Sequence, residues 1–387
     1  MHPTGPITQR FPLVPRIRPA CLPLDARVGR LRELADTASR QADPGQASTV
    51  FNQTALLASD LGLPEYAREL CHRHADLYLP RGPLPAMSTI RGLEPIVNLA
   101  RLHIRAGHHQ RGHQLLLDLY QAVTTSTETV LDGITIPAEL TETDEQRAEV
   151  RAWLWRIVIA DGTRALTASG HWSEALHHIE KHRGIGRRIL DGRQVAVLAR
   201  ATTGDLPGAL ALLKETEPGE PWEDAVTAVL TAVCRPGDQR ATDRALGHCL
   251  ALEPDEGLAV FTTRLALTAL DAADPDTSAA RNLLARLTSR TGESGDGYAL
   301  RDLLNHEGVR RRLDPVQGAT LERALAACAL GSATLPDALR DRLEEALEHA
   351  HGVLEKSPFD PGSPAGNPLE QRFSPAPTGA LSDAARR

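Results

Sequence analysis

The chain has 387 residues, a formal net charge of −7, 41% hydrophobic residues and only 3% aromatic residues. The acidic balance argues against broad nucleic-acid binding, which requires a basic surface. The shortage of aromatic residues fits a large β-sandwich poorly and favours close packing of Ala- and Leu-rich helices. The sequence shows neither an apolar stretch that could span a bilayer nor a signal-peptide pattern, and its five cysteines include no CxxC pair. We therefore expect a cytoplasmic protein without a membrane partner.

The chain order predicts three regions. Residues 1–27 form a proline-rich arm, because prolines at positions 3, 6, 12, 15, 19 and 23 are incompatible with a helix. This arm either lies along the following helices or stays mobile. A helical repeat domain follows over 28–355, with clear repeats at 48–235 and divergent ones at 236–355. The tail at 356–387 is rich in Pro, Gly, Ala and Ser and is predicted to be disordered.

Apolar periodicity divides the clear repeats into antiparallel helix pairs. The predicted pairs are 48–61 with 64–79, 94–106 with 110–123, 173–182 with 192–203, and 206–216 with 222–233. We expect a loop at 80–92, which is rich in Pro and Gly. Residues 124–142 are expected to form either an inserted loop or a short hairpin at 130–136. Thr143 and Gln146 resemble a capping box that opens a helix over 144–168. Fainter helices are predicted at 241–252, 256–273, 277–289, 296–304, 315–329 and 336–355.

A turn glycine followed five positions later by a small residue recurs along this region. The copies are Gly62 with Ala67, Gly170 with Ala175, Gly204 with Ala209 and, more weakly, Gly107 with Gly112. The glycine lets the chain turn after a first helix, and the small residue lets the second helix approach closely. The last two full copies are 34 residues apart, which is the tetratricopeptide period.

On these residues the chain resembles a divergent tetratricopeptide-repeat array. Ala55 and Ala100 fill the small position seven residues before the turn glycine, although the early aromatic position is filled only by Phe51. The chain is also similar to the C-terminal repeat regions of actinobacterial regulators, but its first 45 residues are too short and too proline-rich for a helix-turn-helix domain. The pattern predicts an all-α solenoid of antiparallel helix pairs with a concave groove, an architecture used mostly for binding.

The position of each residue relative to the turn glycine predicts which polar side chains face the groove. These candidates are Asn52, Gln53, Asn98, Arg101, Asp161, Arg164 and Gln194. Arginine offers forked donors to carboxylates, and a side-chain amide pairs with a peptide backbone. The alternative is that these residues satisfy helix ends or pair with each other, as Asp161 and Arg164 could at a spacing of three.

Three other groups of residues allow a functional and a structural interpretation. Arg187, Arg188 and Arg193 form a basic run that could contact phosphate, although it lacks the features of a P-loop. Histidines cluster at 103, 108, 109 and 113 and, with Glu174, at 178 and 182, yet their spacing completes no recognisable ligand set, so we expect no metal and no cofactor. The four tryptophans are expected to pack in the core, unless one is exposed in the groove as an anchor for a partner.

The leading hypothesis is a binding or scaffold protein whose groove holds a peptide or protein partner, in regulation or in a specialised biosynthetic pathway. A second hypothesis is a sensor of a peptide or metabolite. A third is an unusual enzyme that uses the His and Glu clusters or the groove arginines, so enzymatic activity is left open. An apolar-rimmed groove favours binding, whereas a closed polar pocket with convergent His and Glu favours catalysis.

Overall fold

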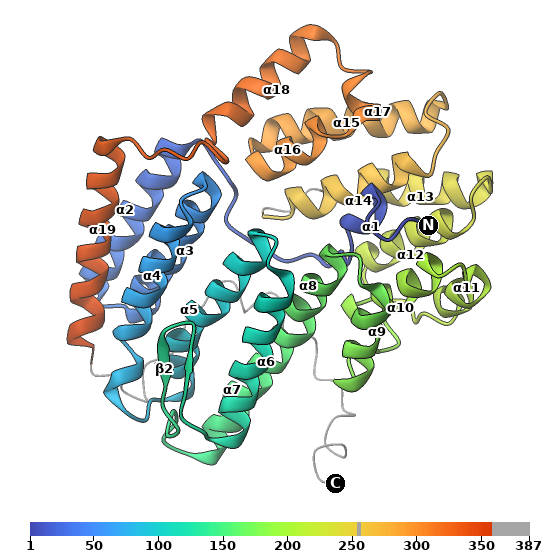
Figure 1. The fold of residues 1–387 in the computed structure, drawn as a ribbon. Coiled ribbons are helices and arrows are strands. Elements are labelled where there is room, and N and C mark those ends of the chain that lie inside the picture. Colours follow the sequence, from blue (N-terminus) through green and yellow to red (C-terminus); the bar gives the residue numbers. More distant parts are fainter. Residues whose placement is uncertain (254–256, 358–387) are drawn as a thin grey trace.

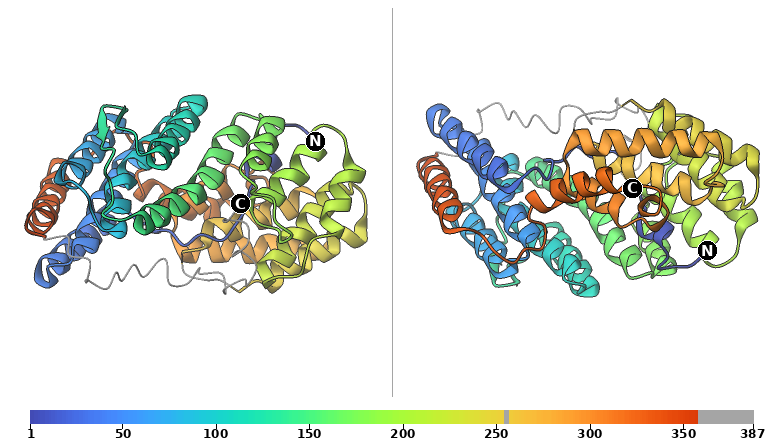
Figure 2. Two further views of the ribbon diagram at one scale, coloured as in Figure 1. Left: turned by 90° about the horizontal axis from the view of Figure 1, so that it is seen from below. Right: turned by 90° about the horizontal axis from the view of Figure 1, so that it is seen from above.

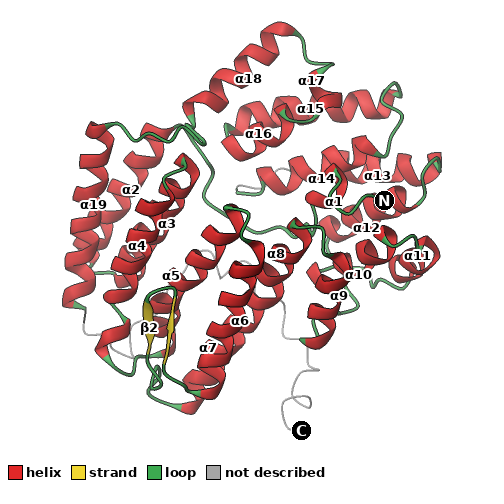
Figure 3. Cartoon of the chain, viewed as in Figure 1, coloured by secondary structure: helices red, strands yellow, loops and turns green. Residues whose placement is uncertain are grey.

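The computed structural model describes residues 1–253 and 257–357, and apart from one small hairpin this part of the chain is helical (Figures 1 and 3). The prediction of an all-α fold is confirmed. Of the predicted tail at 356–387, residues 358–387 lie outside the described residues, and Lys356 is the last residue of a helix. No described helix is both long enough and apolar enough to traverse a lipid bilayer.

The elements follow one another in the order shown in Figure 1. They are α1 (Pro6–Gln9), α2 (Leu24–Gln41), α3 (Pro44–Leu61), α4 (Pro64–Asp76), the 3₁₀ turn η1 (Leu79–Arg81), α5 (Ala86–Arg105), α6 (His109–Thr125), β1 (Thr129–Leu131), β2 (Ile134–Ile136), α7 (Asp144–Ile157), the π-helical turn η2 (Val158–Gly162), α8 (Thr163–Ala168), α9 (Trp172–Lys181), α10 (Asp191–Thr202), α11 (Leu206–Lys214), α12 (Pro221–Cys234), α13 (Gln239–Ala251), α14 (Ala259–Asp271), α15 (Ser278–Ser294), α16 (Gly297–Leu304), α17 (Glu307–Arg310), α18 (Pro315–Ala327) and α19 (Asp337–Lys356).

Local sequence explains where these helices begin and end. Helix α3 starts at Pro44, where the preceding Asp43 side chain accepts hydrogen bonds from the backbone N–H groups of Gly45 and Gln46. It ends at Gly62, which adopts a left-handed φ of 81° that most side chains disfavour. The other three predicted turn glycines also have positive φ values. The glycine pattern therefore located the turns correctly.

The segment between α6 and α7 forms the hairpin alternative of the sequence prediction. Strands β1 and β2 pair antiparallel, with Thr129 opposite Ile136. At its tip, the Asp132 carboxylate accepts hydrogen bonds from Arg68 of α4 and Arg111 of α6. The hairpin is therefore held against the helices by charge-assisted hydrogen bonds.

Two segments that were expected to be non-helical contain helix. The expected loop at 80–92 is helical from Ala86, because the buried side chains of Ile90 and Leu93 fill the core beneath α5, and Gly92 allows close contact with Tyr78. The arm also contains the single helical turn α1, since Pro6 occupies a first helical position, where proline is tolerated.

The last helix of the domain packs against the first helices. Helix α19 packs against α2 and α3, and both views in Figure 2 show it in orange-red beside the blue helices. The preceding linker is tied to the end of α3, where the N–H groups of Gly331 and Ala333 donate to the carbonyl oxygens of Asp60 and Leu61 at 2.8 and 2.7 Å. The end of the helical domain therefore lies beside its beginning.

Separate hydrophobic cores define two halves of the molecule. The N-terminal half comprises α2–α7 with α19, and the C-terminal half comprises α9–α18. Phe11 and Leu13 of the arm are buried in the core of the C-terminal half. From there, the arm crosses the centre of the molecule toward α2 (Figure 1). The alternative in which the arm lies along the helices is therefore the one observed.

Candidate ligand-binding cavity

A cavity of about 570 Å³ lies where the two halves meet. Much of its wall comes from helices α3 and α5 and from the α7–η2–α8 segment. The C-terminal half contributes α14 and Tyr298 of α16, and the arm contributes residues 12–19. Its volume is within the range of pockets that hold small-molecule ligands. Apolar residues such as Trp153 and Phe261 line it together with amides and arginines.

The structure brings six of the seven predicted groove residues to this cavity. They are Asn52, Gln53, Asn98, Arg101, Asp161 and Arg164. The residues come from α3, α5 and the η2–α8 segment, so these successive segments contribute them to one common surface. Gln194 is the exception and lies outside the cavity wall.

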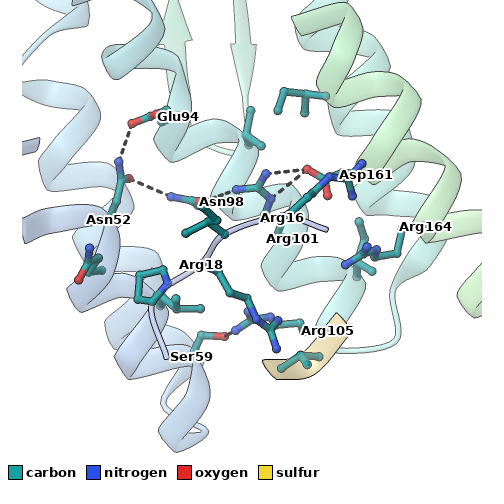
Figure 4. Close-up of a pocket in the computed structure, with 18 of the residues that line it drawn as sticks. Arg16, Arg18, Asn52, Ser59, Glu94, Asn98, Arg101, Arg105, Asp161 and Arg164 are labelled. Atoms are coloured by element: carbon teal, nitrogen blue, oxygen red, sulfur yellow. Dashed lines mark hydrogen bonds and ion pairs between the residues drawn. The ribbon is translucent and has the colours of Figure 1, made fainter. Parts of the chain in front are cut away.

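Five polar side chains form a continuous hydrogen-bonded row along the cavity wall (Figure 4). Asn52 donates to Glu94 at 2.6 Å and accepts from Asn98 at 2.9 Å. Arg101 donates to Asn98 at 3.1 Å and to Asp161 at 2.7 Å. The row thus crosses from α3 through α5 to η2 and displays side-chain amides beside paired charges. The alternative that these residues pair with each other is realised for this part of the set.

A π-helical turn positions the end of this row. Residues 144–168 were predicted as one helix, but η2 interrupts it at Val158–Gly162. The wider turn shifts the register of the helix between Ile157 and Arg164, and both of these residues line the cavity together with Asp161. Such turns occur frequently at functional sites. The apolar periodicity of 144–168 gave no indication of this interruption.

Arginines dominate the charge of the cavity wall. Six of them line it, namely Arg16, Arg18, Arg101, Arg105, Arg164 and Arg264, against the two carboxylates of Glu94 and Asp161. Four of the six have carboxylate partners, in the pairs Arg16–Asp191, Arg101–Asp161, Arg105–Asp60 and Arg264–Asp302. Within residues 1–253 and 257–357, Arg18 and Arg164 form no ion pair and donate no side-chain hydrogen bond.

The electrostatics of the wall reflect this crowding of positive charge. Burial within the protein lowers the pKa of Arg164 to about 10, and the charge of Arg16 contributes to the shift. Burial also lowers the pKa of Arg18. Burial alone would raise the pKa of Asp161, but Arg101 and Arg164 hold it below its usual value. At neutral pH the wall therefore carries ionised guanidinium groups and an ionised, paired carboxylate.

Gln194 binds the arm instead of lining open space. Its fully buried side chain accepts a hydrogen bond from the N–H of Leu13 at 2.7 Å and donates to the carbonyl oxygen of Leu13 at 2.8 Å. The prediction that Gln194 faces the inner side of the array is consistent with this contact, but the arm covers the residue. The sequence could not show this because the partner is 181 residues away.

The basic run contacts protein acceptors. Arg187 pairs with Glu217, and Arg188 donates to the buried Glu223 at 3.0 Å. Arg193 is buried and donates to Thr216 and to the carbonyl oxygens of Gly186 and Leu212. These contacts use donors that a phosphate would need, so phosphate contact at this run stays a sequence prediction with no further support from the geometry.

Histidines gather between α6 and α9, away from the cavity wall. His113 Nε2 lies 3.3 Å from His178 Nδ1, and His178 Nε2 lies 3.0 Å from the carbonyl oxygen of Val158. Burial lowers the pKa of His178 to about 4 and also lowers the pKa of His182. Among the described residues, no group of three or more His, Cys, Asp or Glu side chains is arranged to hold a metal ion.

The tryptophans divide between the core and the surface. Trp153 and Trp172 are buried, as expected, and the indole N–H of Trp172 donates to the carbonyl oxygen of Pro3 in the arm. Trp155 is exposed, and its N–H donates to the carbonyl oxygen of His182. Trp153 is the tryptophan that reaches the cavity wall.

Sequence reasoning missed the cavity residues that come from outside the clear repeats. Arg16 and Arg18 belong to the arm, and Arg264 and Tyr298 belong to the divergent region. Two arginines within a proline-rich arm were the available signal for the first pair. No protein-family model matches the chain, and no curated protein matches it at a significant level of sequence similarity.

Proposed function

We propose that this chain is a binding protein that holds an extended peptide segment of a partner in the cavity between its two halves. The observation that carries the proposal is the contact between Gln194 and the arm. One side-chain amide there pairs with both backbone polar groups of Leu13, so this molecule already uses a carboxamide to hold a non-helical segment of its own backbone.

The same chemistry is present at the cavity wall, where, among the described residues, Asn52 and Asn98 hydrogen-bond to other side chains and not to the backbone of the arm. Asn52 occupies the position ten residues before Gly62, as Gln194 does before Gly204. Asn52, Gln53 and Asn98 are only half-buried and line the cavity. A peptide backbone needs both donors and acceptors along its length, and carboxamides provide both.

The composition of the wall supports binding over catalysis. Within the described residues, the lining contains arginines, amides, aliphatic and aromatic side chains, two carboxylates, a serine, a threonine and the Cys71 thiol, but no histidine. Its carboxylates, Glu94 and Asp161, accept hydrogen bonds from Asn52 and Arg101. The convergent His and Glu pair expected of the enzyme hypothesis is therefore not among the described lining residues.

Selection from a random-sequence heptapeptide display library tests the proposal. We expect the full chain to enrich a set of peptides, and we expect Asn98→Ala to weaken their binding by about tenfold through the loss of hydrogen bonds to the peptide backbone. Asn282→Ala is the matched control, because this asparagine is exposed on α15 and remote from the cavity wall. Failure to enrich any peptide, or equal binding by Asn98→Ala and wild type, would overturn the proposal.

A further inference from the structure

The charge of the cavity wall constrains the chemistry of its occupant. Four of the six lining arginines are neutralised by carboxylates of the protein, which leaves Arg18 and Arg164. The close-up shows Arg18 reaching into the cavity from the arm and Arg164 from the far wall (Figure 4). Two guanidinium groups without an acceptor thus face the space that a ligand would fill.

Arg18 is held in place without satisfying its donors. Its guanidinium lies over the ring of Tyr298, with Cζ 4.3 Å from the ring centroid. The hydroxyl of Tyr298 donates to Asp60, which also accepts from Arg27 and Arg105. This network fixes the tyrosine and therefore the platform on which Arg18 rests. Nevertheless, the Nη2 atom of Arg18 is buried without a hydrogen-bond partner. A buried guanidinium donor without an acceptor costs free energy, and an anionic ligand would remove that cost.

Arg164 is similarly placed and unpaired. It follows the π-helical turn on α8, and its side chain is surrounded by protein but accessible from the cavity that it lines. Arg101 takes the nearest carboxylate, Asp161, through two nitrogen atoms at 3.0 and 2.7 Å. Arg164 therefore retains its forked donors for an acceptor brought by a ligand.

Resting on the proposed function, we propose that Arg18 and Arg164 form an anion site that binds carboxylate groups of an acidic peptide. Guanidinium groups bind carboxylates with paired, directional hydrogen bonds, and the surrounding amides suit the backbone that carries them. Arg18 belongs to the arm, so the occupant contacts the arm on one side and the helices on the other. The arm is thus part of the site.

The display selection extends directly to this inference through the composition of the enriched peptides. We expect Asp and Glu to be over-represented at one or two positions among peptides selected by the wild type, and we expect this bias to disappear with Arg18→Gln and with Arg164→Gln. Replacing Glu by Gln in the best peptide should weaken its binding to the wild type at least about tenfold, the usual effect of losing a charge-assisted hydrogen bond.

Two arginines serve as matched controls. Arg301 lies near the same Tyr298 ring, with Cζ 5.8 Å from the centroid, but does not line the cavity. Arg156 is exposed on α7 and also lies outside the cavity wall. Arg301→Gln and Arg156→Gln should retain the acidic bias. A thermal unfolding curve for each variant establishes that it is folded.

The possible outcomes separate this inference from the proposed function. Peptides enriched without an acidic bias, or with a bias that survives both Arg18→Gln and Arg164→Gln, would overturn the anion site and leave peptide binding standing. Displacement of the peptide by inorganic phosphate at equal concentration would show a site for small anions and overturn the assignment to peptide carboxylates. Selection of no peptide would remove the proposed function and this inference with it.

Discussion

Gln194 and Asn52 occupy the same position relative to their turn glycines, one in each half of the molecule, but they have different surroundings. Gln194 is fully buried beneath the arm and binds its backbone, whereas Asn52 is half-buried and faces the cavity. The C-terminal half therefore uses its inner face to hold the chain's own arm. In the N-terminal half, Asn52 lines a cavity that residues 12–19 of the arm also border, but among the described residues it forms no hydrogen bond to the backbone of the arm.

The two carboxamides therefore have different roles, although they occupy the same position relative to a turn glycine. Where the arm covers an amide, the amide contributes to folding, because removing it would leave backbone groups buried and unpaired. Where the amide faces the cavity, it hydrogen-bonds to other side chains of the polar row and keeps capacity for further hydrogen bonds to a ligand. Variants in the two halves should thus differ in how their effects divide between stability and binding.

Acidification should produce the largest effect and show whether the halves lose stability together. Burial lowers the pKa of His74 in the N-terminal half to about 3, and burial lowers the pKa of His178 at α9 to about 4, both from 6.5. Because the folded protein favours the neutral forms, their contribution is complete above pH 6.5 and is lost as the pH falls toward the folded pKa values. Each histidine should decrease the free energy of unfolding by about 1.4 kcal/mol per pH unit in that window.

Urea unfolding followed by circular dichroism at successive pH values measures this slope. His74→Gln and His178→Gln should each make the slope shallower, which assigns the loss to one half or the other. A stability that does not change between pH 6.5 and the folded pKa of about 4 would contradict the assigned shifts.

Gln194→Ala should be the most damaging of the substitutions on the inner face. It removes three buried hydrogen bonds and leaves the N–H and carbonyl oxygen of Leu13 without partners. We expect a loss of about 2–4 kcal/mol in the free energy of unfolding, measured by urea titration. Gln110→Ala, at an exposed position of α6, is the control. Equal stability of Gln194→Ala and wild type would mean that the arm contributes nothing to the fold.

The sequence predicted the helices and the residues of one common surface better than it predicted contacts between segments that are far apart in the chain. Turn glycines such as Gly62 act locally, so their spacing located the turns and brought Asn52, Asn98 and Arg101 to one surface. Two other contacts depend on residues that are far apart in the chain. They are the packing of α19 against α2 and the hydrogen bonds between Leu13 and Gln194. Local periodicity contains no information about such contacts. Arg18, which reaches the cavity from the arm, could not be predicted for the same reason.

Asn98→Ala should have a smaller effect on stability than Gln194→Ala, although both remove an inner-face amide. Asn98 is half-buried and exchanges hydrogen bonds with Asn52 and Arg101, which can bind water when it is removed. We expect a loss of about 0.5–1.5 kcal/mol in the free energy of unfolding. A loss as large as that of Gln194→Ala would show that the polar row is structural and would remove the contrast between the halves.

We expect Arg164→Ala to have the smallest effect on the free energy of unfolding. Comparison with Arg101→Ala shows whether this difference follows from the ion pair that Arg101 forms. Arg101→Ala breaks the pair with Asp161 and leaves a carboxylate that is only 14% exposed, but the arginine itself is 45% exposed and the pair is partly screened by solvent. We expect a loss of about 1 kcal/mol. Arg164→Ala breaks no ion pair; it removes a positive charge that Arg16 disfavours and Asp161 favours, so stability should stay within about 0.5 kcal/mol of wild type. Urea unfolding of the two variants side by side measures the difference. If Arg164→Ala proved the more destabilising, Arg164 would have a structural role, and the cavity would lose one of the two guanidinium groups available to an acidic occupant.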